Sequence, residues 1–257
     1  NVNIIRTCLN TVENIFITLP KKYKNKDKYK IPKKLIKQFP KIQFLSASVD
    51  IGPALKVIGG AIYLKSRSLD DSIIIVIDDD NVYGRSMVDT FAYFSLKYPN
   101  GAFTSTALQH ITAFGFPPVL PISDPLLKPC YILEGFAGYA TRVQNIDAEL
   151  IIALARRDLN PMLTDCYQSD DVVISFVLAF KGIQFASTMV SNSPLFTGFQ
   201  KKELNYYKDE YALHLRNSDE TRSVQVINDS KYNSTIEILA KFALDWDSDG
   251  MKFLKRK

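Results

Sequence analysis

The sequence predicts an α/β protein in which a mostly parallel central sheet is flanked by helices. Strand-like and helix-like patterns alternate through the first half of the chain, which is typical of βαβ units. The run 73–77 is short, β-branched and uncharged, as in a strand that is buried on both faces. With 257 residues, 46% of them hydrophobic, the chain is long enough to form a single domain over residues 1–257.

The individual elements follow from apolar periodicity and from the Pro, Gly and charged residues at their ends. Pro32 and Pro53 suit the first turn of a helix. The apolar face expected after Pro53 consists of Leu55, Ile58, Ile62 and Leu64. Strands are expected at 14–19, 42–45, 73–77, 102–107, 130–133 and 183–186. Helices are expected at 4–13, 32–38, 53–64, 85–98, 148–156, 170–181 and 231–242. Residues 187–228 are irregular and are expected to form a lid or an acceptor-binding region.

The composition is ordinary for a globular protein, and no apolar segment is long enough to span a bilayer. Cys8, Cys130 and Cys166 are odd in number and lack metal-ligand spacing, so we expect buried thiols in a reducing compartment. These features predict a cytoplasmic protein. The alternative is the lumenal domain of a secretory-pathway enzyme whose anchor is absent from this chain.

The net charge of +5 comes mainly from lysines between Lys21 and Lys41. Such a run suits a nucleic acid or an anionic membrane. It contains no Arg and few interleaved aromatic residues, so a solvated loop that leads into a short helix is the preferred interpretation. We therefore expect no nucleic-acid partner.

Three carboxylates, Asp78, Asp79 and Asp80, directly follow the run 73–77. Ligands bind at the carboxyl ends of strands in open α/β sheets, and clustered carboxylates at the edge of a core are unfavourable without a cation between them. The triplet thus favours a divalent cation that holds a phosphate-bearing substrate. Because Asp also caps helices and is common in turns, the triplet alone does not decide between a metal site and a turn.

Two further segments carry candidate site residues. Gly135 and Gly138 allow a ligand to approach the backbone closely, and the Gly135 N–H is a candidate donor to it; the alternative is an ordinary bend. Asp170 and Asp171 begin a helix after Ser169, its expected N-cap. Either they stabilise the helix N-terminus, or one of them acts as a general base.

Lys56 lies in the first turn of the helix that Gly52 and Pro53 open. A helix N-terminus with a nearby cation suits a diphosphate, and an ordinary surface lysine explains the residue equally well.

Together these segments resemble the glycosyltransferases of the GT-A fold, in particular a microbial and viral group that uses nucleotide sugars. The likeness rests on four short motifs in the same order and with similar spacing, over about residues 14–186. The motifs are Asp50-Ile-Gly-Pro-Ala-Leu-Lys56, similar to the group's D-x-G-P-x-x-K; Asp78-Asp79-Asp80 followed by Tyr83; Glu134-Gly-Phe-Ala-Gly138; and Cys166 with Asp170-Asp171-Val-x-Ile-Ser.

The resemblance implies a Rossmann-like sheet with a nucleotide-sugar-binding half at 1–110 and a smaller acceptor-side half at 111–257. It implies an inverting transfer of a sugar from a UDP-, GDP- or dTDP-sugar to a hydroxyl of a glycan or another acceptor, with Mn²⁺ or Mg²⁺ as cofactor. Asp78 and Asp80 look like the pair that holds the metal. Asp171, or its neighbour Asp170, would be the base that deprotonates the acceptor.

Donor contacts are implied as well. Asp79 is similar to the residue that faces the ribose or the sugar. Lys56 and Asp50 would lie along the nucleotide, and Glu134 and Gly135 would line the sugar and acceptor side.

Two features depart from the family pattern. The family's first strand, with a Thr/Ile-Pro-x-Arg stretch that contacts the nucleotide base, should precede residues 4–13 and is missing. Either the N-terminus lies outside this chain, or base recognition is changed. A third protein ligand for the metal is also unassigned; His214 is the candidate, and a structural role is preferred for His110, the other histidine.

Three other functions stay open. A non-catalytic carbohydrate- or nucleotide-binding protein would retain the same fold. A sugar nucleotidyltransferase would share the sheet and the acidic site, although its Gly- and Arg/Lys-rich phosphate loop is not visible here. A nucleic-acid binder would leave the acidic motifs unexplained. The sequence favours the glycosyltransferase.

Overall fold

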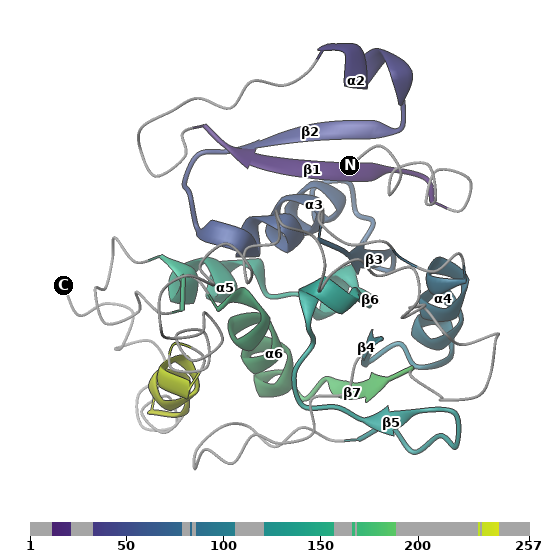
Figure 1. The fold of residues 1–257 in the computed structure, drawn as a ribbon, viewed down its shortest axis with the longest axis vertical. Coiled ribbons are helices and arrows are strands. Elements are labelled where there is room, and N and C mark those ends of the chain that lie inside the picture. The colour runs from purple at the N-terminus through teal and green to yellow at the C-terminus, as the bar shows by residue number, and fades with distance from the viewer. Residues whose placement is uncertain are drawn as a thin grey trace, which may run out of the picture.

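A computed structural model describes residues 12–21, 33–78, 83, 86–105, 121–156, 166–167, 169–188, 231 and 233–241 of the chain. This part of the chain is a mixed α/β structure with two sheets (Figure 1). The strands are β1 (Ile15–Pro20), β2 (Ile42–Ala47), β3 (Ile73–Val76), β4 (Gly101–Thr104), β5 (Lys128–Pro129), β6 (Tyr139–Arg142) and β7 (Gln184–Ser187). The helices are α2 (Lys33–Gln38), α3 (Leu55–Lys65), α4 (Met87–Lys97), α5 (Ala148–Ala155) and α6 (Asp170–Phe180), with 3₁₀ turns η1 (Gly52–Ala54), η2 (Gly135–Ala137) and η3 (Val143–Asn145).

The larger sheet has five strands in the order β3-β6-β4-β7-β5. Strand β6 runs antiparallel to β3 and β4, and β5 runs antiparallel to β7; β4 and β7 are parallel. The prediction of a mostly parallel central sheet is therefore wrong for the strands that the structure describes. Strand β6 was not predicted, because its residues Tyr-Ala-Thr-Arg contain no apolar run. The smaller sheet pairs β1 with β2 in parallel.

Helices cover both faces of the larger sheet (Figure 1). Helices α3, α5 and α6 share one apolar cluster with Ile74, Val76 and Tyr139. Helix α4 packs on the opposite face, where the rings of Phe94 and Phe103 stack with their centroids 5.6 Å apart. Strand β3 thus contacts the core on both faces, as its sequence predicts.

Most of the expected elements are confirmed. The strands expected at 14–19, 42–45, 73–77, 102–107 and 183–186 correspond to β1, β2, β3, β4 and β7. The helices expected at 32–38, 53–64, 85–98, 148–156 and 170–181 correspond to α2, α3, α4, α5 and α6. Residues 231 and 233–241 are helical, as expected for the last helix. The helix expected at 4–13 falls almost wholly outside the described residues, and residues 12–14 are not helical. Residues 189–228 of the irregular segment lie outside as well.

Two local predictions are wrong. Residues 130–133 do not form a strand; this segment passes beside α6, where the Leu133 N–H donates to Ser175 Oγ at 2.9 Å. Ile62, expected on the buried face of α3, is 47% exposed. Ala61 faces the core, and the next position along a helix is turned by roughly 100° from it, which directs Ile62 toward solvent.

Helix α3 connects the small sheet to the rest of the structure, and it approaches β1 closely at Gly59. A Cβ at this position would overlap the Thr18 side chain. Phe16 of β1 and Tyr63 of α3 pack nearby, with ring centroids 5.2 Å apart. The absence of a side chain at Gly59 therefore sets the distance between helix and strand.

In the described residues, none of the helices has the length and apolar character needed to cross a membrane.

We predict that Gly59→Ala lowers the free energy of unfolding by about 1–3 kcal/mol, because overpacking costs more than the better helix propensity of Ala returns. Urea unfolding measures the change. Adding Thr18→Ala should restore part of the loss, since it removes two of the overlapped side-chain atoms. A single variant as stable as the parent chain would contradict this packing.

Candidate functional site

The candidate site lies at the end of the larger sheet where β3, β4 and β7 finish and β6 begins. Val76, the last residue of β3, pairs with Tyr139, the first residue of β6, and Thr104 at the end of β4 pairs with the same Tyr139. Ser187 at the end of β7 lies beside Thr104. Because β6 runs antiparallel to β3, the segment that follows β3 and the segment that precedes β6 meet at this end of the sheet. Asp78 belongs to the first segment and Gly135 to the second.

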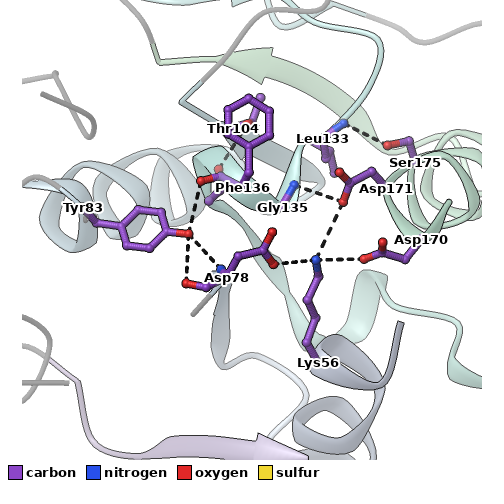
Figure 2. Close-up of polar contacts among 11 residues, drawn as sticks. Lys56, Asp78, Tyr83, Thr104, Leu133, Gly135, Phe136, Asp170, Asp171 and Ser175 are labelled. Atoms are coloured by element: carbon purple, nitrogen blue, oxygen red, sulfur yellow. Dashed lines mark hydrogen bonds and ion pairs between the residues drawn. The ribbon is translucent and has the colours of Figure 1, made fainter. Parts of the chain in front are cut away.

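The ammonium group of Lys56 lies at the centre of the site (Figure 2). Its Nζ atom is 2.7 Å from Asp78 Oδ1, 2.9 Å from Asp170 Oδ2 and 4.0 Å from Asp171 Oδ1. These residues come from the start of α3, the end of β3 and the start of α6. The carboxylates predicted from two separate motifs therefore converge on the lysine of a third.

Tight packing of η1, which leads directly into α3, against the segment before α6 brings Lys56 to this position. Gly52 has a φ of 69°, and a Cβ there would overlap the backbone carbonyl of Tyr167. Asp50 Oδ1 accepts a hydrogen bond from the Gly52 N–H at 3.0 Å and so stabilises the turn. Residue 52 must be glycine both for its φ and for this close approach.

The glycine-containing turn η2 packs directly on the charged groups. The Gly135 N–H donates to Asp171 Oδ1 at 3.0 Å. A Cβ on Gly135 would overlap Lys56 Nζ and lie 3.0 Å from the same carboxylate oxygen. The sequence predicted that this N–H donates to a ligand; in the structure it orients Asp171 instead.

Tyr83 ties the acidic segment to η2. Its hydroxyl accepts a hydrogen bond from the Asp78 N–H at 2.8 Å and lies 3.2 Å from the Phe136 carbonyl, to which it can donate (Figure 2). The ring is buried. The sequence placed Tyr83 in a motif but assigned it no role, and its position three residues after the aspartate triplet was the available signal.

Burial and charge act against each other at Lys56 and Asp171. Burial lowers the pKa of Lys56 and is the largest single effect, but Asp170, Asp171 and Asp78 together raise that pKa well above its ordinary value. Burial also raises the pKa of the Asp171 carboxyl well above its usual range, and the charge of Asp170 adds to this. The Lys56 ammonium and the Gly135 N–H act in the opposite direction on Asp171.

Two buried oxygens of the site make no hydrogen bond within the described residues. Asp170 Oδ2 lies 2.9 Å from Lys56 Nζ as an ion pair, but not in hydrogen-bond geometry. The Tyr139 hydroxyl is buried, and its pKa is raised well above the ordinary value, mainly by burial. Tyr139 was missed by the sequence analysis, and nothing in its local pattern distinguishes it from a core residue.

The structure brings together five of the predicted site residues: Lys56, Asp78, Gly135, Asp170 and Asp171. Asp50 lies in the turn before α3, and Glu134 directly precedes η2. Asp79, Asp80 and His214 lie outside the described residues.

Ser169 occupies the N-cap position of α6, as expected, but its side chain makes no capping hydrogen bond. The Ser169 carbonyl accepts from the N–H groups of Val172 and Val173 at 3.1 Å, and these are the first hydrogen bonds of the helix.

Among the described residues, no three His, Cys, Asp or Glu side chains are grouped so that they could hold a metal ion by themselves. A complete metal site would need further ligands, and Asp79 and Asp80 adjoin Asp78 in the sequence.

Comparison of the chain with known protein families and with curated proteins found no match. The residues of the site are therefore the basis for inferring the function.

We predict that Lys56→Met lowers the free energy of unfolding at neutral pH by about 2–4 kcal/mol, because it leaves partly buried carboxylates without their cation. The loss should shrink as the pH falls. Without the ammonium, the folded pKa of Asp171 rises further above its unfolded value, so the native form binds a proton that the unfolded chain has released, and acid stabilises it.

Urea unfolding between roughly pH 5 and pH 7.5 measures both effects. The matched control is Lys97→Met, which removes an ammonium 2.8 Å from Asp124 Oδ2. The Lys97 side chain is 44% exposed, and the Tyr98 hydroxyl and the Leu126 N–H still donate to Asp124, so stability should change far less. A loss for Lys56→Met that does not depend on pH would contradict the assignment.

Proposed function

We propose that the chain is a metal-dependent glycosyltransferase of the GT-A type, which moves a sugar from a nucleotide sugar to an acceptor hydroxyl by inverting displacement. The observation that carries the proposal is the convergence of Asp78, Asp170 and Asp171 on Lys56. These residues belong to three of the four motifs on which the resemblance rests. Lys56 and Asp171 are separated by 115 positions in the chain, and the meeting of such distant motifs supports the proposal that they serve one site.

The carboxylates fit a divalent cation. Asp78 Oδ1 and Asp170 Oδ2 are hard oxygen ligands, and both already contact one positive group at 2.7 and 2.9 Å. In this proposal Asp78 and Asp80 hold Mn²⁺ or Mg²⁺, with His214 as a further candidate ligand. The bound metal would neutralise the charge that develops on the leaving diphosphate.

Asp171 is the candidate base. A carboxylate whose pKa is raised accepts a proton more readily. The pKa of Asp171 is raised by burial and by the charge of Asp170. The Gly135 N–H fixes the orientation of Asp171 through its Oδ1. In the transfer, Asp171 would take the proton of the acceptor hydroxyl while the acceptor oxygen bonds to the anomeric carbon and the nucleoside diphosphate leaves from the opposite face.

In this proposal the remaining predicted residues line the donor around this core. Lys56 stands at the start of α3, where it can reach a diphosphate, and Asp50, Asp79, Glu134 and Gly135 would line the donor. In this arrangement residues 1–110 form the nucleotide-sugar half and residues 111–257 the acceptor half.

One observation favours a second candidate, a non-catalytic nucleotide- or carbohydrate-binding protein. The Lys56 ammonium occupies the centre of the carboxylates, so the described groups have a counter-charge without any metal. Such a protein would bind a nucleotide sugar without releasing a nucleoside diphosphate. An assay for nucleotide release in the presence of Mn²⁺ separates the two candidates.

We predict that one class among UDP-, GDP- and dTDP-sugars raises the melting temperature of the protein, and that the increase requires Mn²⁺ or Mg²⁺. A ligand that binds only the native form stabilises it by about 2.7 kcal/mol at a hundredfold excess over its Kd. Differential scanning fluorimetry with each sugar, with and without metal, measures the effect. No increase with any donor would count against the proposal.

We also predict that Asp171→Asn reduces sugar transfer by roughly 10²–10⁴-fold, the usual contribution of a general base, and leaves donor affinity unchanged. The amide oxygen can still accept from the Gly135 N–H, so the fold of the site should persist. Asp124→Asn is the matched control, because it makes the same substitution in the ion pair with Lys97. If Asp171→Asn abolishes donor binding, the residue contacts the donor and is not the base.

A further inference from the structure

The described groups of the site carry more negative charge than the Lys56 ammonium balances. Three carboxylates, Asp78, Asp170 and Asp171, surround one ammonium, which leaves two negative charges when all are ionised. The side chain of Asp170 is only 10% exposed, so water screens this excess poorly. The site as described therefore attracts more positive charge than Lys56 supplies.

Two buried oxygens of the cluster make no hydrogen bond among the described residues, although one of them is ion-paired with Lys56. These oxygens are Asp170 Oδ2, which forms the ion pair, and the Tyr139 hydroxyl. The Tyr139 hydroxyl interacts electrostatically with Lys56 and with all three carboxylates, so it belongs to the same cluster. Buried polar atoms are nearly always partnered, and two such exceptions in one cluster indicate a group that is bound there during function.

Taking these observations together, we infer that Lys56 is a resident counter-cation that competes with a divalent metal for the carboxylates of Asp78 and Asp170. This inference rests on the proposed function, since it concerns the metal that the proposed transfer uses. An ammonium and a divalent ion cannot both lie within 3 Å of the same carboxylate oxygens without strong repulsion. Lys56 therefore leaves these carboxylates when the metal binds.

Release of Lys56 gives the lysine a second role. Its ammonium stands on the first turn of α3, and the only change needed is rotation of a flexible side chain that is 22% exposed. Once free of the carboxylates, it pairs with the diphosphate of the donor. Lys56 thus offsets part of the carboxylate charge before the metal arrives and contacts the donor afterwards.

The test measures Mn²⁺ binding without any donor. The free-Mn²⁺ signal in electron paramagnetic resonance gives the affinity of the parent chain, Lys56→Met, Lys56→Arg and Lys97→Met. We expect Lys56→Met to bind Mn²⁺ at least roughly tenfold more tightly than the parent, because a nearby like charge is removed. Lys56→Arg, which keeps the charge, and Lys97→Met should bind like the parent. Equal or weaker binding by folded Lys56→Met overturns the inference.

A second measurement uses the unmodified chain and so does not depend on the variant folding. Acetylation of lysines by acetic anhydride is followed by mass spectrometry with and without Mn²⁺. Lys56 should react faster when Mn²⁺ is bound, because its ammonium is freed, while Lys97 should react at the same rate in both samples. An unchanged or slower reaction of Lys56 at saturating Mn²⁺ overturns the inference.

The two proposals fail in different ways. If donor turnover requires Mn²⁺ but Lys56→Met and the parent bind Mn²⁺ equally, the inference fails and the proposed function stands. If Lys56→Met gains affinity for Mn²⁺ but no variant binds or consumes a nucleotide sugar, the competition is real and the proposed function fails. If no variant binds Mn²⁺, the inference fails together with the metal-dependent part of the function.

Discussion

The arrangement of the site depends on one ion-paired cation. Lys56 connects the end of β3, through Asp78, to the start of α6, through Asp170. Two opposite charges about 3 Å apart attract by roughly 5 kcal/mol at an effective dielectric constant of about 20. Desolvation costs several kcal/mol for each buried ion, which is of the same order. The two contributions nearly cancel, so the pairing fixes geometry more than it adds stability, and another cation can take the place of the ammonium at little cost.

Close backbone packing makes this pairing possible. Gly52 allows the start of α3 to pack against Tyr167 just before α6, and Gly135 leaves the space that Lys56 Nζ occupies. Tyr83 then holds the backbone of Asp78 against η2. Backbone contacts therefore place Asp171, Asp78 and Lys56, and side-chain substitutions at the surface do not alter these contacts. The proposed displacement would need such fixed positions, because donor and acceptor must be aligned for it.

Several residues selected from the sequence lie together in the fold, but most of their contacts were not predictable from local patterns. Asp78, Asp170, Asp171, Lys56 and Gly135 were each selected from local patterns, and they do lie together. The use of the Gly135 N–H by Asp171 was not foreseen, because the two residues are 36 positions apart and a local pattern records no such pairing. Tyr139 was missed for a related reason: its hydroxyl is notable only because of the charged groups that surround it in the fold.

The sequence by itself determined where most helices and strands form, because apolar periodicity and the Pro and Gly residues at element ends act over a few neighbours. It also determined which side chains are able to bind a cation or accept a proton. Only the tertiary structure decided the direction of the strands. Strand β6 is antiparallel to β3 and β4 because the chain enters the sheet between them from the end where the site lies. A local pattern does not predict this direction, since strand pairing depends on residues far apart in the chain. The tertiary structure likewise decided that Lys56 contacts Asp78, 22 positions away, rather than solvent, since the energy of an ion pair depends on distance in space.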